Sequence, residues 1–356
     1  SGCHGGYDLS VAPHNIWQGG MMAQAGRDPL FWAAVAITEQ DLPGAGDLCI
    51  RCHSPRGWLE GRSTPTDGSA LTSGDALGIE CDLCHSLCNP DDSEWIGTQV
   101  APFVANDGGS PVEGYYGSGQ FVLSPDKSRF GPYLNTVARH QHDQARYQRE
   151  SELCGTCHDV SNPAVGDLAH NHGSFSPLPG AFSGVFNSPV AGKAAFNNPP
   201  YAYGVVERTF SEHQASAFAT TRVAAFNSLP EWLQDGAIED AWNSAKLAGQ
   251  GGDYEDAKPR LFSCQSCHLP PVEGYGCDKN DAPLRKDLPL HDLTGGNAWT
   301  PKAIVWLDER DRLTLGGGMT EVETAAVVDA AGRARHNLGR AASLAVIGNK
   351  LRVVNL

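Results

Sequence analysis

Cys81-Asp-Leu-Cys84-His85 is the stretch that decides the fold, because its pattern of residues occurs four times in the chain. The other copies are Cys49-Ile-Arg-Cys52-His53, Cys154-Gly-Thr-Cys157-His158 and Cys264-Gln-Ser-Cys267-His268. Two thiols three residues apart lie on one helical turn, where they can bond to the two vinyl groups of one porphyrin. The adjacent histidine then lies under the iron as its proximal ligand. The four copies therefore predict four covalently attached haem c groups.

The chain begins with Ser1-Gly2-Cys3-His4, which are the last four residues of the same pattern. We therefore expect a fifth haem, attached at Cys3 with His4 as its proximal ligand, and further residues before Ser1. The alternative is a Cys-His pair that carries no haem. Covalent haem attachment takes place on the outer side of the bacterial or archaeal inner membrane, so we expect a periplasmic, cell-surface or extracellular protein.

The composition indicates a loop-rich chain whose core contains haem. Glycine (41) and proline (23) are abundant among the 356 residues, and long stretches show no periodicity. Such a chain buries too little apolar surface to offset its conformational entropy, and large flat haems resolve this conflict. We expect a mainly α fold with extensive irregular loops, packed around haems, with the start of a β-rich region at the C-terminal end.

The net charge of the chain is −15. Because a surface that binds nucleic acid is basic, this charge disfavours nucleic acid as a partner. It suits a protein that docks on basic partners or binds cations, and the alternative is a charge that serves solubility alone. No apolar run approaches the roughly 20 residues that span a bilayer, so we expect no transmembrane segment in this sequence.

The motifs divide the chain into three segments. Residues 1–130 hold three attachment motifs, residues 131–300 hold two, and residues 301–356 hold a long helix and the start of a β-rich region. Helices are expected at 27–39, 132–150, 210–226, 230–248 and 320–346. Asp28 and Ser211 are the expected N-caps of two of them. Loops and turns are expected at 5–20, 41–48, 54–80, 89–131 and 160–204, and a strand is expected to start at 351–356.

Two cysteines, Cys88 and Cys277, lie outside the motifs. In an oxidising compartment two remaining cysteines suggest a disulfide, which would join two haem-bearing segments. The alternative is two buried free thiols, and the sequence leaves both open because connectivity cannot be read from it.

Eight histidines remain as candidates for the distal iron positions once the five proximal ones are assigned. They are His14, His140, His142, His170, His172, His213, His291 and His336. Eight candidates for five positions favour iron with two histidine ligands, and therefore low-potential electron transfer. An ordinary surface histidine is the alternative for each, and His170 and His172 rank last because their loop is polar.

Two details bear on these ligands. His140 and His142 are two residues apart on the expected helix 132–150, so they would point to different sides and could ligate two different haems.

Met21 and Met22 precede the expected helix 27–39 in a chain that has only 3 methionines. A methionine beside a haem can ligate the iron and raise its potential, or it can fill a gap in the core. Both alternatives remain open for this pair.

Several stretches of the chain resemble one group of proteins. They are WQGGMMAQAGRDPLFWAA, CIRCHSPRGWLEGRS, GIECDLCHSL, SELCGTCHDVSNP, ERTFSEHQASAF, CQSCHLP and LPLHDLTGGNAW. Together they resemble bacterial multihaem c-type cytochromes that are distantly related to the cytochrome c554 type. The resemblance covers nearly the whole chain and implies electron transfer, without naming a donor or an acceptor. Relatives have Trp where this chain has His213, and they continue beyond the Val-Val-Asn-Leu end into a β-rich region that we expect to be missing here.

Two classes of function compete. The first is an electron carrier in which closely packed haems pass electrons, either as a shuttle, as part of a surface complex or as the subunit of an extracellular cytochrome filament. Its partners would be other redox proteins or copies of itself. The alternative is a multihaem oxidoreductase with one open iron, acting on a small nitrogen or sulfur compound. We favour electron transfer, because the chain has no Cys-x-x-Cys-Lys variant of the motif and no separate catalytic constellation. Storage of haem or metal is a weaker third hypothesis, because a storage protein must release its cargo and a covalently attached haem is not released.

Overall fold

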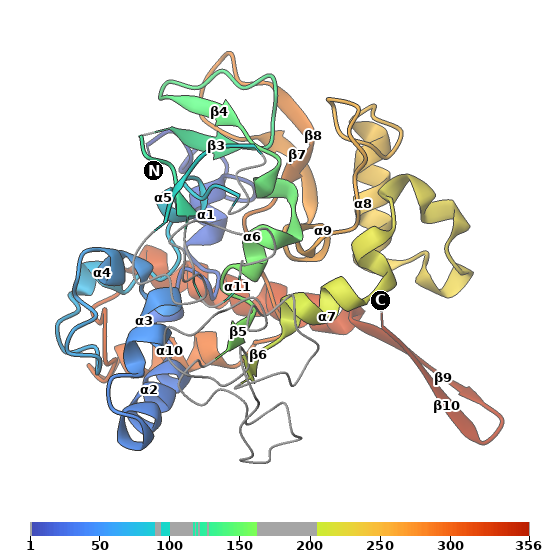
Figure 1. Cartoon of the computed structure of the whole chain (residues 1–356). Coiled ribbons are helices and arrows are strands. Elements are labelled where there is room, and N and C mark those ends of the chain that lie inside the picture. Colours follow the sequence, from blue (N-terminus) through green and yellow to red (C-terminus); the bar gives the residue numbers. More distant parts are fainter. Residues whose placement is uncertain are drawn as a thin grey trace, which may run out of the picture. The chain divides into compact units, whose positions relative to one another are not determined.

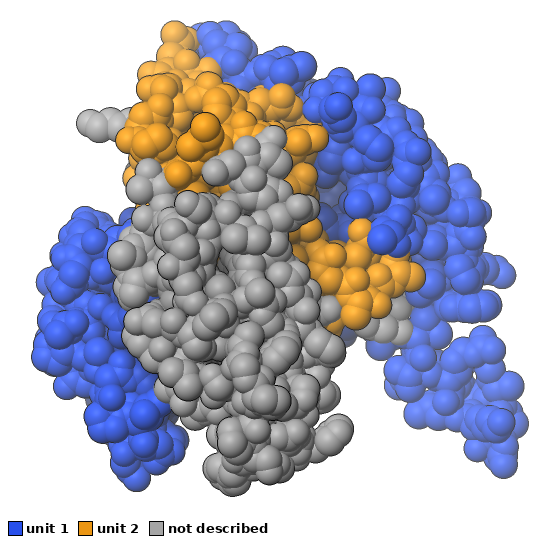
Figure 2. Space-filling view, viewed as in Figure 1, with its two compact units in different colours: residues 1–80, 134–137, 220–356 blue, residues 81–133, 138–219 orange. Residues whose placement is uncertain are grey.

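A computed structural model of the chain describes residues 2–89, 94–99, 117, 119, 122–126, 128–161 and 205–355. The protein contains two compact units, shown in different colours in Figure 2. Unit 1 comprises Ser1–Glu80, Leu134–Val137 and Thr220–Leu356, and unit 2 comprises Cys81–Tyr133 and Ala138–Ala219. The sequence analysis divided the chain into segments 1–130, 131–300 and 301–356 according to the motifs that each contains. That division stays a prediction.

The N-terminal part of unit 1 is a succession of short helices (Figure 1). They are α1 (Pro13–Trp17), η1 (Ala25–Arg27), α2 (Pro29–Asp41), α3 (Gly46–His53), α4 (Pro55–Leu59) and η2 (Ser73–Asp75). The helix expected at 27–39 is confirmed as α2, and the Asp28 carboxylate accepts the Leu30 N–H at 2.8 Å as its N-cap. The loops and turn expected at 5–20, 41–48 and 54–80 are wrong in part, because α1, α3 and α4 begin there. A proline in the first turn of α1 and α4 presets the helical backbone angle.

The C-terminal part of unit 1 is mixed. Its elements are η8 (Val223–Ser228), η9 (Glu231–Leu233), α8 (Gly236–Leu247), α9 (Cys264–His268), β7 (Pro271–Tyr275), β8 (Leu284–Pro289), α10 (Thr300–Asp308), α11 (Glu321–Arg340), β9 (Ala342–Ile347) and β10 (Lys350–Asn355). Strands β7 and β8 pair antiparallel, as do β9 and β10. The helix expected at 230–248 begins only at Gly236, because Asp235 caps it there.

The longest helix, α11, ends earlier than the sequence pattern predicts. The expected helix ran to residue 346, but α11 stops at Arg340 and residues 342–347 form β9 instead. The run Leu344 to Ile347 is apolar and partly β-branched, and it pairs with β10 across a turn in which Gly348 has φ +62°. The strand expected at 351–356 is confirmed as β10.

The β9–β10 hairpin carries four large aliphatic side chains on one face. Leu344 is opposite Val353 and Val346 is opposite Leu351 in the antiparallel register, and each of these four side chains is more than 60% exposed. Arg352 lies between Leu351 and Val353 on β10, so its side chain is on the opposite face of the hairpin. Its guanidinium is 5.8 Å from the Trp232 ring. In Figure 1 the hairpin extends away from the helices of unit 1.

Buried contacts join the N-terminal helices of unit 1 to α11. Arg27 is 6% exposed, and its guanidinium donates to the Gly316 carbonyl at 2.8 Å and pairs with Glu323 at 3.3 Å. A Cβ atom on Gly19 would lie 2.1 Å from the Ala326 carbonyl oxygen, so only glycine lets the backbones approach this closely. These contacts fix α11 against the segment that follows α1.

Unit 2 is built from short elements. They are α5 (Cys81–Cys84), β1 (Thr98–Gln99), β2 (Val122–Leu123), β3 (Arg129–Gly131), β4 (His142–Gln144), η3 (Tyr147–Arg149), α6 (Ser151–Gly155), β5 (Val160–Ser161), β6 (Val205–Glu207) and α7 (Thr209–Ala215). A 3-10 helix, η7 (Ala217–Thr220), follows α7. A small core cluster of Cys88, Val122, Phe130 and Ala145 packs against Trp95.

Of two helices expected in this region, the one at 132–150 is wrong and the one at 210–226 is confirmed only in its first part. Residues 132–150 form β4 and η3, because β4 pairs in parallel with β3 and the Ala145 N–H donates to the Gly131 carbonyl at 3.0 Å. This tertiary pairing outweighs the helical propensity of the run. The helix expected at 210–226 begins one residue earlier, at Thr209, and ends at Ala215, so Ser211 lies inside α7 and is not its N-cap.

Helices hold more of the described residues than strands do, in line with the expected mainly α class. The packing of this fold around haems stays a prediction. Among the residues that the structure describes, no helix is both long enough and apolar enough to cross a membrane.

We expect Thr320→Ala to destabilise the protein by about 1 kcal/mol, since it removes the N-cap of α11. The Thr320 hydroxyl accepts the Glu323 N–H at 3.2 Å, and the Glu323 carboxylate accepts the Thr320 N–H at 2.9 Å. Chemical denaturation measures the loss. Thr324→Ala makes the same change inside the helix and should have little effect; equal losses in both variants would contradict the capping role.

Candidate haem attachment sites

Each complete attachment motif lies in a helical turn. Cys49 and His53 are in α3, Cys81 begins α5, Cys154 is in α6, and α9 is the motif from Cys264 to His268. In two of them the histidine N–H donates to the carbonyl of the first cysteine, from His85 to Cys81 at 3.0 Å and from His158 to Cys154 at 2.9 Å. The turn brings two thiols and an imidazole together, as thioether attachment requires.

The paired thiols of three motifs lie close enough to interact. Burial raises the pKa of the Cys84 thiol to about 12, and the neighbouring Cys81 thiol contributes to the rise. Burial and the partner thiol likewise raise the pKa of Cys49 and of Cys267 to about 11. These cysteines are therefore neutral thiols at neutral pH, each beside its motif partner.

Cys88 and Cys277 are the two cysteines outside the motifs. In the described part of the chain no cysteine is in a disulfide; Cys88 is buried and Cys277 is half-buried. The sequence left a disulfide and two buried thiols open; because Cys88 belongs to unit 2 and Cys277 to unit 1, that choice stays a prediction. Cys277 lies beside Cys3. Burial is the larger cause that raises the pKa of the Cys277 thiol, and the nearby Cys3 thiol is the second.

Four of the five motif histidines have their Nδ1 atom hydrogen-bonded to an acceptor from a distant part of the chain. The contacts are His4 to the Gly276 carbonyl at 2.8 Å, His85 to the Phe130 carbonyl at 2.6 Å, His268 to the Thr294 carbonyl at 2.7 Å and His158 to the Glu207 carboxylate at 3.1 Å. A carbonyl oxygen has no hydrogen, so Nδ1 is the donor in the first three. Nε2 then carries the lone pair, which is the tautomer that a metal-binding histidine needs.

His53, the fifth motif histidine, is held by ring stacking. Its imidazole lies 4.0 Å from the Phe31 ring, measured between centroids, with an interplanar angle of 7°. Phe31 is a buried residue of α2. The orientation of the His53 ring therefore depends on how α2 packs against α3.

The Cys3-His4 segment lies along β7 and the turn that follows it. The Cys3 carbonyl accepts the Asp278 N–H at 2.7 Å, and the Tyr7 hydroxyl donates to the Tyr275 carbonyl at 2.6 Å. Together with the His4 contact, these bonds give His4 the same fixed ring as the complete motifs have. The geometry at His4 therefore suits the expected fifth haem.

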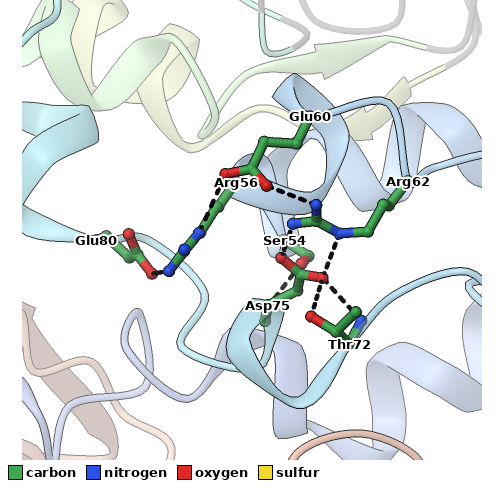
Figure 3. A network of polar contacts seen from close by, with 7 residues as sticks. All are labelled: Ser54, Arg56, Glu60, Arg62, Thr72, Asp75 and Glu80. Carbon is green, nitrogen blue, oxygen red and sulfur yellow. Dashed lines mark hydrogen bonds and ion pairs between the residues drawn. The ribbon is translucent and has the colours of Figure 1, made fainter.

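A polar network in unit 1 joins residues that lie, in the sequence, between the Cys49 motif and Cys81 (Figure 3). It begins at Ser54, the residue after His53. The Ser54 hydroxyl donates to the Asp75 carbonyl at 2.7 Å. The Asp75 carboxylate, which is fully buried, accepts from Arg62 Nε at 2.8 Å. Arg56 pairs with Glu80 at 3.5 Å, directly before Cys81 in the sequence. The network thus fixes the residues that flank the motifs at Cys49 and Cys81.

Burial alone would raise the pKa of the Asp75 carboxyl, but hydrogen bonds from Arg62 and Thr72 hold it below its ordinary value of 3.8. A carboxyl whose pKa is lower in the folded state stabilises the fold above its unfolded pKa. This stabilisation is lost as the pH falls through the folded pKa. The network therefore keeps its full strength at neutral pH and weakens in acid.

The structure brings two of the distal candidates near a motif histidine. The His14 N–H donates to the His4 carbonyl at 2.9 Å, and burial lowers the pKa of the His14 imidazole. Burial also lowers the pKa of the His142 imidazole, and the nearby His140 and His85 lower it further. His142 lies on β4 and His140 precedes that strand, so the expected placement of both on one helix is wrong.

The remaining candidates are less closely tied to a motif. His213, in α7, has a buried Nδ1 without a hydrogen-bond partner among the described residues. His291 follows β8 with its Nδ1 2.9 Å from the Pro289 carbonyl, and His336 is exposed on α11. Met21 and Met22 are half-buried. His170 and His172 lie outside the described residues.

The residues of the motifs are of the kind that covalent haem attachment uses. No three His, Cys, Asp or Glu side chains among the described residues gather into a metal site. A haem iron needs no such cluster, because the porphyrin supplies four ligands and the protein only the axial ones. Paired thiols and histidines with Nδ1 already bonded meet that need.

Comparison of the chain with protein-family models, with curated proteins and with solved structures finds no match in any of the three. The function is therefore argued from the geometry of the sites.

Sequence reasoning missed the groups that hold the motif histidines. Phe31, the Phe130 carbonyl and Glu207 lie 22, 45 and 49 residues from the histidines they contact. No local pattern marks them, because any residue can supply a backbone carbonyl. Only the folded chain identifies them.

We expect Asp75→Asn to lower the free energy of unfolding by about 2–3 kcal/mol, since it removes a buried carboxylate and leaves the Arg62 guanidinium poorly paired. Denaturant titration at pH 7 measures the loss, and the difference from the parent protein should shrink in acid as Asp75 becomes protonated. Glu60→Gln removes an exposed carboxylate from the same network and should have a much smaller effect. A difference that stays constant from pH 7 to pH 3 would contradict the role given to Asp75.

Proposed function

We propose that the protein is a multihaem c-type cytochrome that carries electrons through closely packed haems, most of them with two histidine ligands. The observation that carries the proposal is the hydrogen-bonded Nδ1 atom of His4, His85, His158 and His268. A histidine so held presents Nε2 in a fixed direction, as an axial iron ligand must. Each motif places this histidine one residue after the second thiol of a pair.

The chain's own residues would bind and orient the cofactor. The motif cysteines would hold each haem by thioether bonds, and His4, His53, His85, His158 and His268 would supply the proximal nitrogen. Bound haem supplies one-electron chemistry at its iron. Distal nitrogens would come from the remaining histidines; His14 and His142, near His4 and His85, are the first candidates.

The cellular setting follows from the same proposal. Haem c is attached outside the inner membrane, so the protein would act in the periplasm, at the cell surface or outside the cell. A net charge of −15 favours redox partners with basic docking surfaces. Copies of the same chain, as in a filament, are the other class of partner that we propose.

Haem counting tests the proposal directly. In a host that attaches haem c, the mass of the intact protein should show five haems, and peptides spanning each motif should carry one haem apiece. Cys81→Ser combined with Cys84→Ser should remove one haem, because no thiol remains for that thioether pair. Cys277→Ser, outside the motifs, should leave the number unchanged. A protein without haem would overturn the proposal.

Ligand addition separates the carrier from the oxidoreductase. Iron with two histidine ligands is low-spin and has no open position, so the ferric spectrum should not change with nitrite or hydroxylamine, nor the ferrous spectrum with carbon monoxide. Absorption and electron paramagnetic resonance spectra measure this. A high-spin component that shifts when one of these compounds is added would favour the enzyme.

A further inference from the structure

One motif histidine has a charged acceptor. The Nδ1 atoms of His4, His85 and His268 face neutral backbone carbonyls, whereas His158 Nδ1 lies 3.1 Å from the Glu207 carboxylate. A carboxylate accepts a hydrogen bond more strongly than a carbonyl does, because it carries a full negative charge. The His158 imidazole therefore differs electronically from the other three.

The Glu207 carboxylate is held in place by the surrounding backbone. Residue Val160 of β5 pairs with Glu207 of β6, and the Phe210 N–H donates to the His158 carbonyl at 2.9 Å. Asp159, directly before β5, and Arg208, directly after β6, form a buried ion pair at 3.0 Å. The backbone on both sides of the contact is thus fixed, which keeps Glu207 beside His158.

We propose that Glu207 is a positioning residue for His158 that lowers the reduction potential of the haem attached at Cys154 and Cys157. The inference rests on the proposed function. An anionic acceptor draws the Nδ1 proton away from the ring, which makes Nε2 a stronger electron donor to the iron. A stronger donor stabilises ferric over ferrous iron, and the potential falls.

Solvent limits the size of the effect. The His158 and Glu207 side chains are 45% and 35% exposed, so water screens the carboxylate in part. Bound haem would cover part of this surface and strengthen the interaction. We therefore expect a measurable shift at one haem while the others keep their potentials.

Glu207→Gln tests the proposal, because glutamine keeps the shape and an oxygen acceptor but loses the charge. The control is Glu212→Gln, which removes the same charge from an exposed position on α7. Glu207→Asp keeps the charge and serves as a second variant if the glutamine protein folds poorly. Mass of the peptide spanning Cys154 to His158 shows whether the haem is present, which tests the proposed function separately.

Spectroelectrochemical titration of the holoprotein gives the decisive readout. One midpoint potential should rise in Glu207→Gln, the low-spin signal of one haem should change in the electron paramagnetic resonance spectrum, and Glu212→Gln should match the parent. Glu207→Asp should stay nearer to the parent than the glutamine variant does. With the haem present on the peptide, unchanged potentials in Glu207→Gln, or equal rises in both glutamine variants, would overturn the role of Glu207.

Discussion

The proposed haem sites depend on one constraint: a histidine that gives one ring nitrogen to a metal almost always has its other ring nitrogen held by a hydrogen bond. His4, His85 and His268 meet it with backbone carbonyls, and His158 meets it with a carboxylate. An unfixed imidazole would rotate about two torsions and would lose that freedom on binding. The acceptors remove this loss before any ligand is bound, because they already hold the ring.

This constraint gives the irregular segments a structural role. The carbonyls that hold these rings belong to Gly276 in the turn after β7, to Phe130 in a three-residue strand, and to Thr294 in a loop after β8. A regular helix or a wide sheet uses its carbonyls internally, whereas loops and short strands leave some of them for side chains. The loops and short strands of this chain can therefore hold the motif histidines as firmly as a helix would.

Buried charge fixes the residues next to the motifs. Asp75 with Arg62 holds the segment after His53, and Asp159 with Arg208 holds the segment after His158. Pairs of this kind contribute little net stability but strongly disfavour arrangements that would leave one charge unpaired. Here these pairs favour one backbone conformation in the segments next to the motifs. The positions of the motif thiols and imidazoles depend on that conformation.

The sequence by itself determined the attachment motifs, helix α2 with its Asp28 cap, the body of α11 and strand β10, because each of these is specified by neighbouring residues. Only the tertiary structure decided that residues 142–144 form a strand, that α11 ends at Arg340, and which groups hold the motif histidines. Strand pairing and hydrogen bonds to backbone carbonyls join residues tens of positions apart, so no local pattern contains them. The Cys81 motif shows both: its cysteines and histidine are plain in the sequence, but the direction of the His85 ring is set by the Phe130 carbonyl, 45 residues away.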